Sequence, residues 1–585
     1  MIRRKPRRAE LTAWQKHALS DLRSISVQQP DDLRLIGELI RDSEGNVGII
    51  LQLQTSELSS RDTGLRLQRQ EQFVLWIPPS PLHPPRVEVE HLRFAGYPHV
   101  LQGYRLCIYL DPSREWDPVG GGIRSCLNRL WSWLSDAISD RFDASTAMYH
   151  AVGGVLHWSP GTPTLVIREP GPFKKMQVGY LIPRSEYRLD LTYDPRRIQS
   201  GMRLPVITVE TALPFGAGDT LAEVLKRLDD PFLGSPAGYT PRHIPQSPAV
   251  LTALAASAAK NPRDMPQYLV LAVPHPAGGP PHLLGARIPA SAANVLRRLA
   301  KQHASMIRID PAAVSPDLQI EWCRVSDERP AVTTRRDDSR PVNSFQGKRV
   351  HIWGCGGIGS WIAEFVTRAG AAHITLCDPG AVTGGLLVRQ NYVETDVGKT
   401  KVAALGQRLR AISDDVVIDV ADDTLPMHAD KVVMSVDVVI DATVSVAVGQ
   451  RLELLAALSG RTATLAQVAT DTRTGTLGIL TVSGPGYGEG PLSIDKQTGE
   501  SVLANQNLEL YHALWRNVLD GDELVPTRGC SVPTFHGSSA DLAAVAATLV
   551  TFLGMHLSIP ASGTHLIALP HAGGGPHHHF IAHTT

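Results

Sequence analysis

The spacing of apolar residues changes along the chain and predicts a different kind of structure in each part. From Glu10 to about Ile25 the apolar positions recur at the spacing of an amphipathic helix. The stretches Val47 to Leu53 and Gln72 to Ile77 alternate polar and apolar residues, which predicts antiparallel strands separated by polar turns. Helical spacing returns from Ile123 to Ile138. We therefore expect a small α+β domain over residues 1–150.

The middle of the chain has a mixed pattern with several Pro and Gly breaks. A short strand is predicted at Tyr268 to Val273, and helices are predicted at Thr220 to Leu228 and at Ser291 to Ala300. Residues 151–335 thus form a folded middle domain, a linker between the outer domains, and the pattern indicates no role for it. A charged run from Arg335 to Arg340, next to a proline, indicates the boundary that follows.

Beyond this boundary the order strand, glycine loop, helix and strand repeats as far as about Leu569. This order predicts a parallel α/β sheet over residues 336–569. The apolar stretch Ser539 to Leu557 is expected to be a long helix. Residues 570–585 form a Gly- and His-rich tail, where His577 to His579 offer possible metal ligands, but a solvated terminus is the simpler interpretation. The fold class is therefore multidomain, α+β followed by α/β.

Composition narrows the possible classes of function. The chain has 585 residues, 43% of them hydrophobic and 19% charged, which is typical of a soluble protein of several domains. Its formal net charge of +0 provides no overall field for nucleic acid, and we expect neither nucleic acid nor a membrane as partner, because no apolar span is long enough. Six scattered cysteines form no disulfide framework and the start of the chain lacks an apolar signal core, so we expect a cytoplasmic protein. Four of the cysteines are expected to be core filler: Cys126, Cys323, Cys355 and Cys377.

A nucleotide-binding pattern begins at the β-like run Lys348 to Trp353, which leads into a G-x-G-x-x-G loop and then the apolar helix Ser360 to Ala369. The glycines of this loop are Gly354, Gly356, Gly357 and Gly359. They allow a tight turn, so that a phosphate can lie on free N–H groups at the positive end of the helix dipole. Asp378 follows the next strand, His373 to Cys377, where a carboxylate can accept both hydroxyls of a ribose.

The loop alone also fits an NAD-binding domain, but the residues after Asp378 favour a different chemistry. Arg389, Gln390 and Asn391 come next, and Lys401 follows ten residues later. A hydride-transfer enzyme has no use for cations here. In an adenylation reaction, negative charge gathers on the α-phosphate and on the departing pyrophosphate, and Arg and Lys side chains can neutralise it.

The order of glycine loop, ribose Asp, RQ pair and G-x-x-K resembles the ThiF/MoeB/ubiquitin-activating adenylation family, over roughly residues 340–569. The resemblance implies a Rossmann-like domain that binds ATP and Mg²⁺, with Arg389 and Lys401 on the triphosphate, Asp378 on the ribose and Gln390 and Asp441 in the nucleotide site. Two positions depart from the family. Val444 stands where a second carboxylate usually positions magnesium, and Leu386 replaces an asparagine. Either Asp441 holds the metal alone with water and phosphate oxygens, or the site is impaired.

Cys530 lies in a Gly- and Pro-punctuated loop before the helix that starts near Ser539, with Arg528 close by. A helix start and a neighbouring cation both favour a thiolate. In ubiquitin-activating relatives a cysteine attacks the adenylate, so the resemblance implies a thioester on Cys530. The alternative is a buried structural thiol.

The first domain carries a second candidate nucleophile, Cys107. A P-x-x-P-P segment at Pro81 to Pro85, the triplet Tyr97-Pro98-His99, then Cys107 and a W-x-P at Trp116 to Pro118 resemble ubiquitin-conjugating enzymes across most of residues 10–145. That family has His-Pro-Asn in the triplet, so His99 replaces the asparagine. An imidazole N–H can still donate to the oxyanion that forms when an amine attacks a thioester, but a structural histidine is an equally good interpretation.

Together the two resemblances are similar to bacterial fusions of a ubiquitin-activating and a ubiquitin-conjugating enzyme, as found in CBASS antiphage systems. They imply that the chain adenylates the C-terminus of a ubiquitin-like protein or of a cGAS/DncV-like nucleotidyltransferase, forms thioesters on Cys530 and then Cys107, and conjugates an amine acceptor. A homodimer is also implied. Two other hypotheses stay open: sulfur-carrier activation of the ThiF or MoeB type, which leaves the first domain unexplained, and a non-catalytic scaffold that binds a ubiquitin-like tail.

Overall fold

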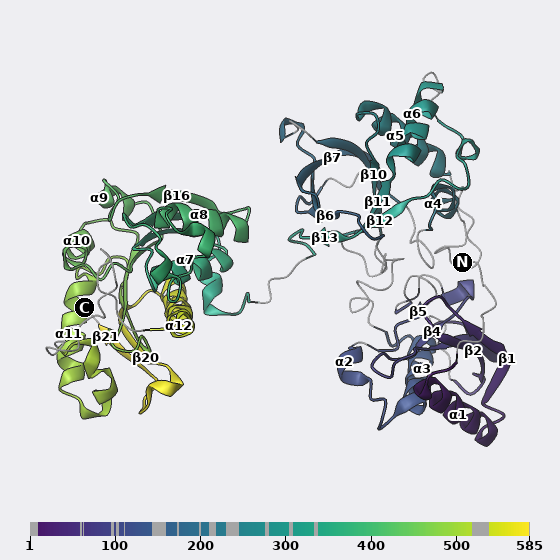
Figure 1. The fold of residues 1–585 in the computed structure, drawn as a ribbon, viewed down its shortest axis with the longest axis horizontal. Coiled ribbons are helices and arrows are strands. Elements are labelled where there is room, and N and C mark those ends of the chain that lie inside the picture. The colour runs from purple at the N-terminus through teal and green to yellow at the C-terminus, as the bar shows by residue number, and fades with distance from the viewer. Residues whose placement is uncertain are drawn as a thin grey trace. The chain divides into compact units, whose positions relative to one another are not determined.

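The protein is described here by a computed structural model with two compact units, Met1–Thr334 and Arg335–Thr585 (Figure 1). The structure describes residues 10–58, 61, 64–94, 97, 99–100, 105–109, 111–142, 159–171, 175–197, 201–209, 218–229, 245–274, 280–302, 308–332, 337–516 and 537–583.

The first part of the chain is an antiparallel meander with helices, as the apolar spacing predicts. Its strands follow the order β1-β2-β3-β4-β5 in one sheet. They are β1 Leu33–Arg41, β2 Val47–Gln54, β3 Gln70–Ile77, β4 Arg86–Glu88 and β5 Arg105–Leu106, and the helices are α1 Ala13–Gln28, α2 Pro112–Glu115 and α3 Gly122–Ile138. Helix α1 begins where the Thr12 side chain accepts from the Gln15 N–H and the Gln15 side chain accepts in return from the Thr12 N–H. Alternate residues of β2 and β3 are buried with α1 and α3 in one apolar core.

The middle part contains an eight-stranded sheet in the order β12-β11-β10-β9-β7-β8-β6-β13. Its strands are β6 Thr164–Ile167, β7 Met176–Ser185, β8 Arg188–Thr192, β9 Met202–Thr208, β10 Gln267–Val273, β11 His282–Ile288, β12 Glu321–Cys323 and β13 Val325–Asp327, and its helices are α4 Leu221–Leu228, α5 Ser247–Lys260 and α6 Ala290–Gln302. Only Arg324 separates β12 from β13, although these strands lie at opposite ends of the order. Because neighbouring Cα atoms are about 3.8 Å apart, the sheet must curl until its edges meet. Accordingly, a Cβ placed on Gly285 of β11 would lie 2.5 Å from the Leu165 side chain of β6.

The second unit is built on another eight-stranded sheet, in the order β16-β15-β14-β17-β18-β19-β20-β21. The strands are β14 Arg349–Trp353, β15 His373–Cys377, β16 Val417–Ala421, β17 Val438–Asp441, β18 Thr464–Thr470, β19 Leu477–Ser483, β20 Ser562–Ala568 and β21 His578–His583. The helices are α7 Gly359–Arg368, α8 Lys401–Ile412, α9 Ala429–Val432, α10 Val446–Ala456, α11 Pro491–Leu503 and α12 Ser539–Ser558. The expectation of a parallel sheet is correct for β14 to β18 but wrong for β19 to β21, which pair antiparallel. Strand β18 leads into β19 by a short turn, and a parallel pair would need a long crossover.

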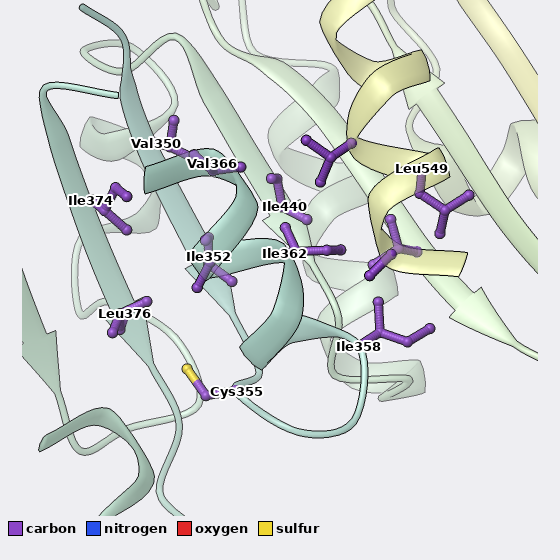
Figure 2. Close-up of a cluster of buried hydrophobic side chains, with 14 of the residues drawn as sticks. Val350, Ile352, Cys355, Ile358, Ile362, Val366, Ile374, Leu376, Ile440 and Leu549 are labelled. Atoms are coloured by element: carbon purple, nitrogen blue, oxygen red, sulfur yellow. The ribbon is translucent and has the colours of Figure 1, made fainter. Parts of the chain in front are cut away.

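The core of the second unit gathers side chains from both ends of this region. Figure 2 shows the cluster, in which Ile352 of β14, Ile362 of α7 and Leu549 of α12 lie together. By length and composition α12 is apolar enough to cross a membrane, so the expectation that no such span exists is wrong. Its buried side chains lie within this core, as those of a core helix do. The apolar face of α12 is thus covered inside its own domain.

The C-terminal residues belong to the sheet, which corrects the expectation of a solvated tail after Pro570. Strand β21 pairs with β20, and its His578 Nε2 lies 3.0 Å from His565 Nδ1. The other ring nitrogen of His565 lies 2.7 Å from Nε2 of His556 on α12. His565 and His556 are buried, and aromatic rings of Phe552 and Phe580 stack on His565. The imidazoles thus form a hydrogen-bonded chain, and no group of three metal-binding side chains occurs among the described residues.

We expect this histidine chain to make the second unit sensitive to acid. Burial, and then the neighbouring His556 and His578, lower the pKa of His565 from 6.5 to about 3. Between these two pH values the unfolded chain binds a proton that folded His565 does not, so stability is fully present above pH 6.5 and is lost as the pH falls towards 3. The unfolding free energy should fall by about 1.4 kcal/mol per pH unit in this range. Urea unfolding of wild type and His565→Gln at pH 7.5 and pH 5 measures it, and equal pH slopes in the two proteins would contradict the assignment.

Candidate functional site

The glycine loop and the two aspartates predicted for the nucleotide site lie at the carboxyl ends of neighbouring strands in the sheet of the second unit. Strand β14 pairs in parallel with β15 on one side and with β17 on the other, so the strand order reverses between β14 and β17. At such a switch point the loops that follow the strands diverge, and they leave a crevice at the carboxyl ends. The glycine loop and Asp378 directly follow β14 and β15, and Asp441 is the last residue of β17. This brings together residues that are far apart in the sequence.

Two glycines of the loop are required by close backbone contacts. Gly354 has a φ of +86°, and a Cβ there would lie 2.8 Å from the carbonyl carbon of Ala442. A Cβ on Gly359 would lie 1.9 Å from the Gly354 oxygen. A Cβ on Gly356 would meet nothing within 4 Å, so open space lies beside the loop there. Helix α7 begins at Gly359, so the positive end of its dipole lies at the glycine loop, in the position that suits an anion.

Asp378 is buried and tied to the glycine loop. Its Oδ2 accepts from the Cys355 N–H at 2.7 Å, and its Oδ1 accepts from the Gly380 N–H at 2.7 Å. Lys401 Nζ lies 3.7 Å from the same carboxylate, and the lysine side chain is only 16% exposed. Lys401 is the first residue of α8, and its N–H donates to the Gly380 oxygen at 2.9 Å. The predicted ribose carboxylate and the predicted phosphate cation are thus neighbours.

The RQN segment lies against the helix that starts at the glycine loop. The Trp361 indole N–H donates to the Arg389 oxygen at 3.1 Å, and the Asn391 N–H donates to Ser360 Oγ at 3.1 Å. Burial lowers the pKa of the Arg389 guanidinium from its ordinary value. Gln390 Oε1 is buried and has no hydrogen-bond partner among the described residues, which fits a ligand that supplies a donor.

Two further residues position the site, and the sequence analysis assigned them no role. Asn391 is buried, and its side-chain amide donates to Glu364 of α7 at 2.7 Å. The Tyr392 hydroxyl donates to the Cys355 oxygen at 2.7 Å, so Tyr392 also holds the glycine loop in place. Their position directly after Arg389 and Gln390 was the feature of the sequence that could have indicated this role.

The residues around Asp441 do not fit a magnesium ion held by this carboxylate. Asp441 is fully buried, its Oδ1 accepts from the Thr443 N–H and hydroxyl at 2.9 and 2.6 Å, and its Oδ2 accepts from Gln467 Nε2 at 3.0 Å. Val444, at the place of the family's second carboxylate, is 76% exposed and has a φ of +50°, which is rare for a β-branched residue. The Val444 side chain therefore offers no oxygen ligand at the position where magnesium would need one.

The candidate residues of the first domain also come together. The Cys107 N–H donates to the His99 oxygen at 2.8 Å, and the Trp116 indole donates to the Pro81 oxygen at 2.7 Å, which joins two segments of the predicted motif. Cys107 is half-buried, and burial raises the pKa of its thiol, partly offset by the charge of Arg105. His99 is buried, with a φ of +61° and its ring centroid 4.7 Å from that of Phe142.

The remaining cysteines separate into two groups. The four that were expected to be core filler are buried, which confirms that expectation: Cys126, Cys323, Cys355 and Cys377. Burial raises the pKa of the Cys126, Cys323 and Cys377 thiols to about 12, so they are poor nucleophiles. Cys530, the predicted first thioester site, lies outside the described residues.

Comparison with known proteins agrees with the geometry of the crevice. Residues 339–486 match the ThiF family, and residues 197–328 match the Cap2 central linker domain. The first match confirms the resemblance of this part of the chain to the ThiF family. The second identifies the middle region, to which the sequence pattern gave no function.

Individual relatives match only segments of the chain. The tRNA threonylcarbamoyladenosine dehydratase of Escherichia coli K12 is 33% identical over 92 residues, 16% of this chain and 34% of the dehydratase. The ATP-dependent ubiquitin transferase-like protein Cap2 of Vibrio cholerae is 33% identical over 127 residues, 21% of this chain and 22% of that protein. The crystal structure of E. coli MccB with ATP superimposes with a TM-score of 0.29 and 14% identity over 41% of this chain and 66% of MccB. The chain therefore carries a ThiF-family domain, joined on its N-terminal side to a Cap2 central linker domain.

Proposed function

We propose that this chain uses ATP to adenylate the C-terminus of a partner protein and then transfers it through cysteine thioesters to an amine. The observation that carries this proposal is the meeting of Asp378 and Lys401 at a glycine loop in a ThiF-family domain, with the backbone of Arg389 packed against the helix that follows the loop. The matching linker domain and the similarity to Cap2 proteins, which are named as ATP-dependent ubiquitin transferase-like, favour a ubiquitin-like pathway in antiphage defence.

The residues of the crevice have distinct parts in the first step. A carboxylate oxygen of the partner attacks the α-phosphorus of ATP, the bond from that phosphorus to the bridging oxygen breaks, and pyrophosphate leaves. Lys401 and Arg389 neutralise the charge that develops on the phosphates, and backbone N–H groups of the glycine loop, at the positive end of the α7 dipole, bind a phosphate. Asp378 accepts from the ribose hydroxyls, for which Lys401 must turn from the carboxylate towards the phosphates.

The later steps concern the two cysteines. The Cys530 thiolate attacks the carbonyl carbon of the adenylate, and AMP leaves. The acyl group then moves to Cys107 by thioester exchange, and an amine finally attacks, loses a proton and releases the Cys107 thiolate. His99, beside Cys107 in the fold, is proposed to donate to the oxyanion of this last step. We place the reaction in the cytoplasm, with a ubiquitin-like protein or a cGAS/DncV-like nucleotidyltransferase as the activated partner.

The test of this function is ATP–pyrophosphate exchange with a cGAS/DncV-like nucleotidyltransferase or a ubiquitin-like protein, intact and with its last residues removed. Exchange that needs the intact C-terminus supports adenylation. Its absence with every partner would instead favour the scaffold hypothesis, which Val444 at the expected metal position also favours. Trapping of a partner on Cys107 separates conjugation from sulfur-carrier activation. Mass spectrometry of complexes captured with the Cys107→Lys protein identifies the partner.

We further expect the chain to form a homodimer, because members of the adenylation family commonly associate through this domain. The expected result of light scattering is a mass of twice the chain at micromolar concentration. A monomer under these conditions would contradict the prediction.

A further inference from the structure

The turn that follows β17 forms one wall of the glycine loop. The Ala442 N–H donates to the Trp353 oxygen at 2.8 Å, directly before Gly354. A Cβ on Gly354 would lie 2.8 Å from the Ala442 oxygen and 2.9 Å from the Thr443 nitrogen. The loop therefore packs on the backbone of this turn with no space between them, and a shift of the turn must shift the loop.

Asp441 fixes the shape of that turn. It is paired with Trp353 of β14 on one side and with Gln467 of β18 on the other. Its carboxylate accepts twice from Thr443 and once from Gln467, so two donors from the turn itself and one from β18 hold it. The Thr443 hydroxyl in turn accepts from the Ser445 N–H at 3.2 Å, and Ser445 caps α10. The network extends from the buried carboxylate to the start of the next helix.

We propose that Asp441 is a positioning residue that shapes the glycine loop from the β17 side, and that it does not coordinate magnesium. This inference rests on the proposed adenylation function. The glycine loop is then held between two carboxylates: Asp378 binds it directly through the Cys355 N–H, and Asp441 supports it through the backbone of Ala442 and Thr443. Both oxygens of this carboxylate already accept hydrogen bonds and the residue has no exposed surface, so it offers no open position to a metal ion, whereas it is well suited to hold a turn.

The two roles differ in what happens without a metal. A metal ligand affects binding only of the magnesium complex, whereas a residue that shapes the loop affects phosphate binding itself. The experiment measures the affinity of the full chain for ATP by calorimetry, once in EDTA and once in saturating magnesium, for wild type, Asp441→Ala, Asp441→Asn and Thr443→Val. Circular dichroism confirms that each variant is folded.

We expect Asp441→Ala to weaken ATP binding by about tenfold in both conditions, because the turn loses its buried acceptor. Asparagine keeps one oxygen for Thr443, and Gln467 can rotate its amide to accept from the new donor, so Asp441→Asn should stay within about threefold of wild type. Thr443→Val removes one donor of the network from a residue that no metal would touch, and it should fall between the two. The magnesium concentration for half-maximal exchange should be unchanged in Asp441→Asn.

Normal ATP affinity of Asp441→Ala in EDTA, combined with loss of affinity in magnesium, would overturn the inference and make Asp441 a metal ligand. A raised magnesium requirement in Asp441→Asn would do the same. If Asp441→Ala does not fold, Asp441→Asn and Thr443→Val still distinguish the two roles. If Asp441 were a metal ligand, Asp441→Asn would weaken ATP binding in magnesium and Thr443→Val would not. Failure of the proposed function itself has a different result, since wild type would then bind no ATP in either condition.

Discussion

Replacing Lys401 with alanine is expected to lower ATP–pyrophosphate exchange by on the order of 100-fold, the usual loss when one charge-stabilising donor is removed. The ammonium group is mostly buried at the start of α8, where backbone pairing with Gly380 holds it at the crevice. The loss should fall mainly on kcat, because the charge that Lys401 neutralises develops in the transition state.

Arg389→Ala is expected to have an effect of similar size for the same reason. A matched control is Lys399→Ala, two residues before Lys401 in the sequence. The Lys399 side chain is 40% exposed and its ammonium pairs with Asp396 at 2.9 Å, and that carboxylate keeps its hydrogen bond from the Val393 N–H, so exchange should stay within about twofold of wild type. Wild-type exchange in either Arg389→Ala or Lys401→Ala would mean that the phosphate assignment is misplaced.

The second large effect concerns the order of transfer between the two cysteines. Cys530→Ala should abolish adducts at both cysteines and leave pyrophosphate exchange intact, because adenylation precedes the first thioester. Cys107→Ala should instead leave an adduct on Cys530 that a reductant removes. Cys107→Lys should trap an isopeptide that resists reductant, because its amine becomes the final acceptor. Electrophoresis with and without reductant, followed by mass spectrometry, measures each species.

Cys323→Ala is the control for these variants, since Cys323 is buried and burial raises the pKa of its thiol to about 12. It should load like wild type. Full loading of Cys107 in the Cys530→Ala protein would contradict the relay and would leave Cys530 as a structural thiol.

Local sequence patterns were enough to predict most of the helices and strands, and to predict which residues form the nucleotide site. Each of the elements α1, α3, β2 and β3 buries one face. Its apolar residues therefore recur with the period of a helix or of a strand, and this period is visible within the segment itself. The predicted nucleotide residues come together because the carboxyl ends of parallel strands meet at one edge of a sheet. The similarity of the first domain to conjugating enzymes, and the role of Cys530, stay predictions.

By itself the sequence determined where the glycine loop lies, which cations follow it and which of the described cysteines are buried, because each depends on residues within one or two neighbouring elements. Only the tertiary structure decided three other points. Strand β21 joins the sheet of the second unit, and β12 and β13 bring the edges of the middle sheet together. The Asp441 carboxylate accepts hydrogen bonds from Thr443 and Gln467. Each of these depends on which strands become neighbours, and strand pairing is set by contacts between segments that are distant in the sequence. From the sequence alone, a glycine- and histidine-rich terminus is expected to be solvated, because the sequence does not show that His565 lies beside it. In the same way, Asp441 is expected to be a metal ligand as long as the side chains that donate to it are unknown.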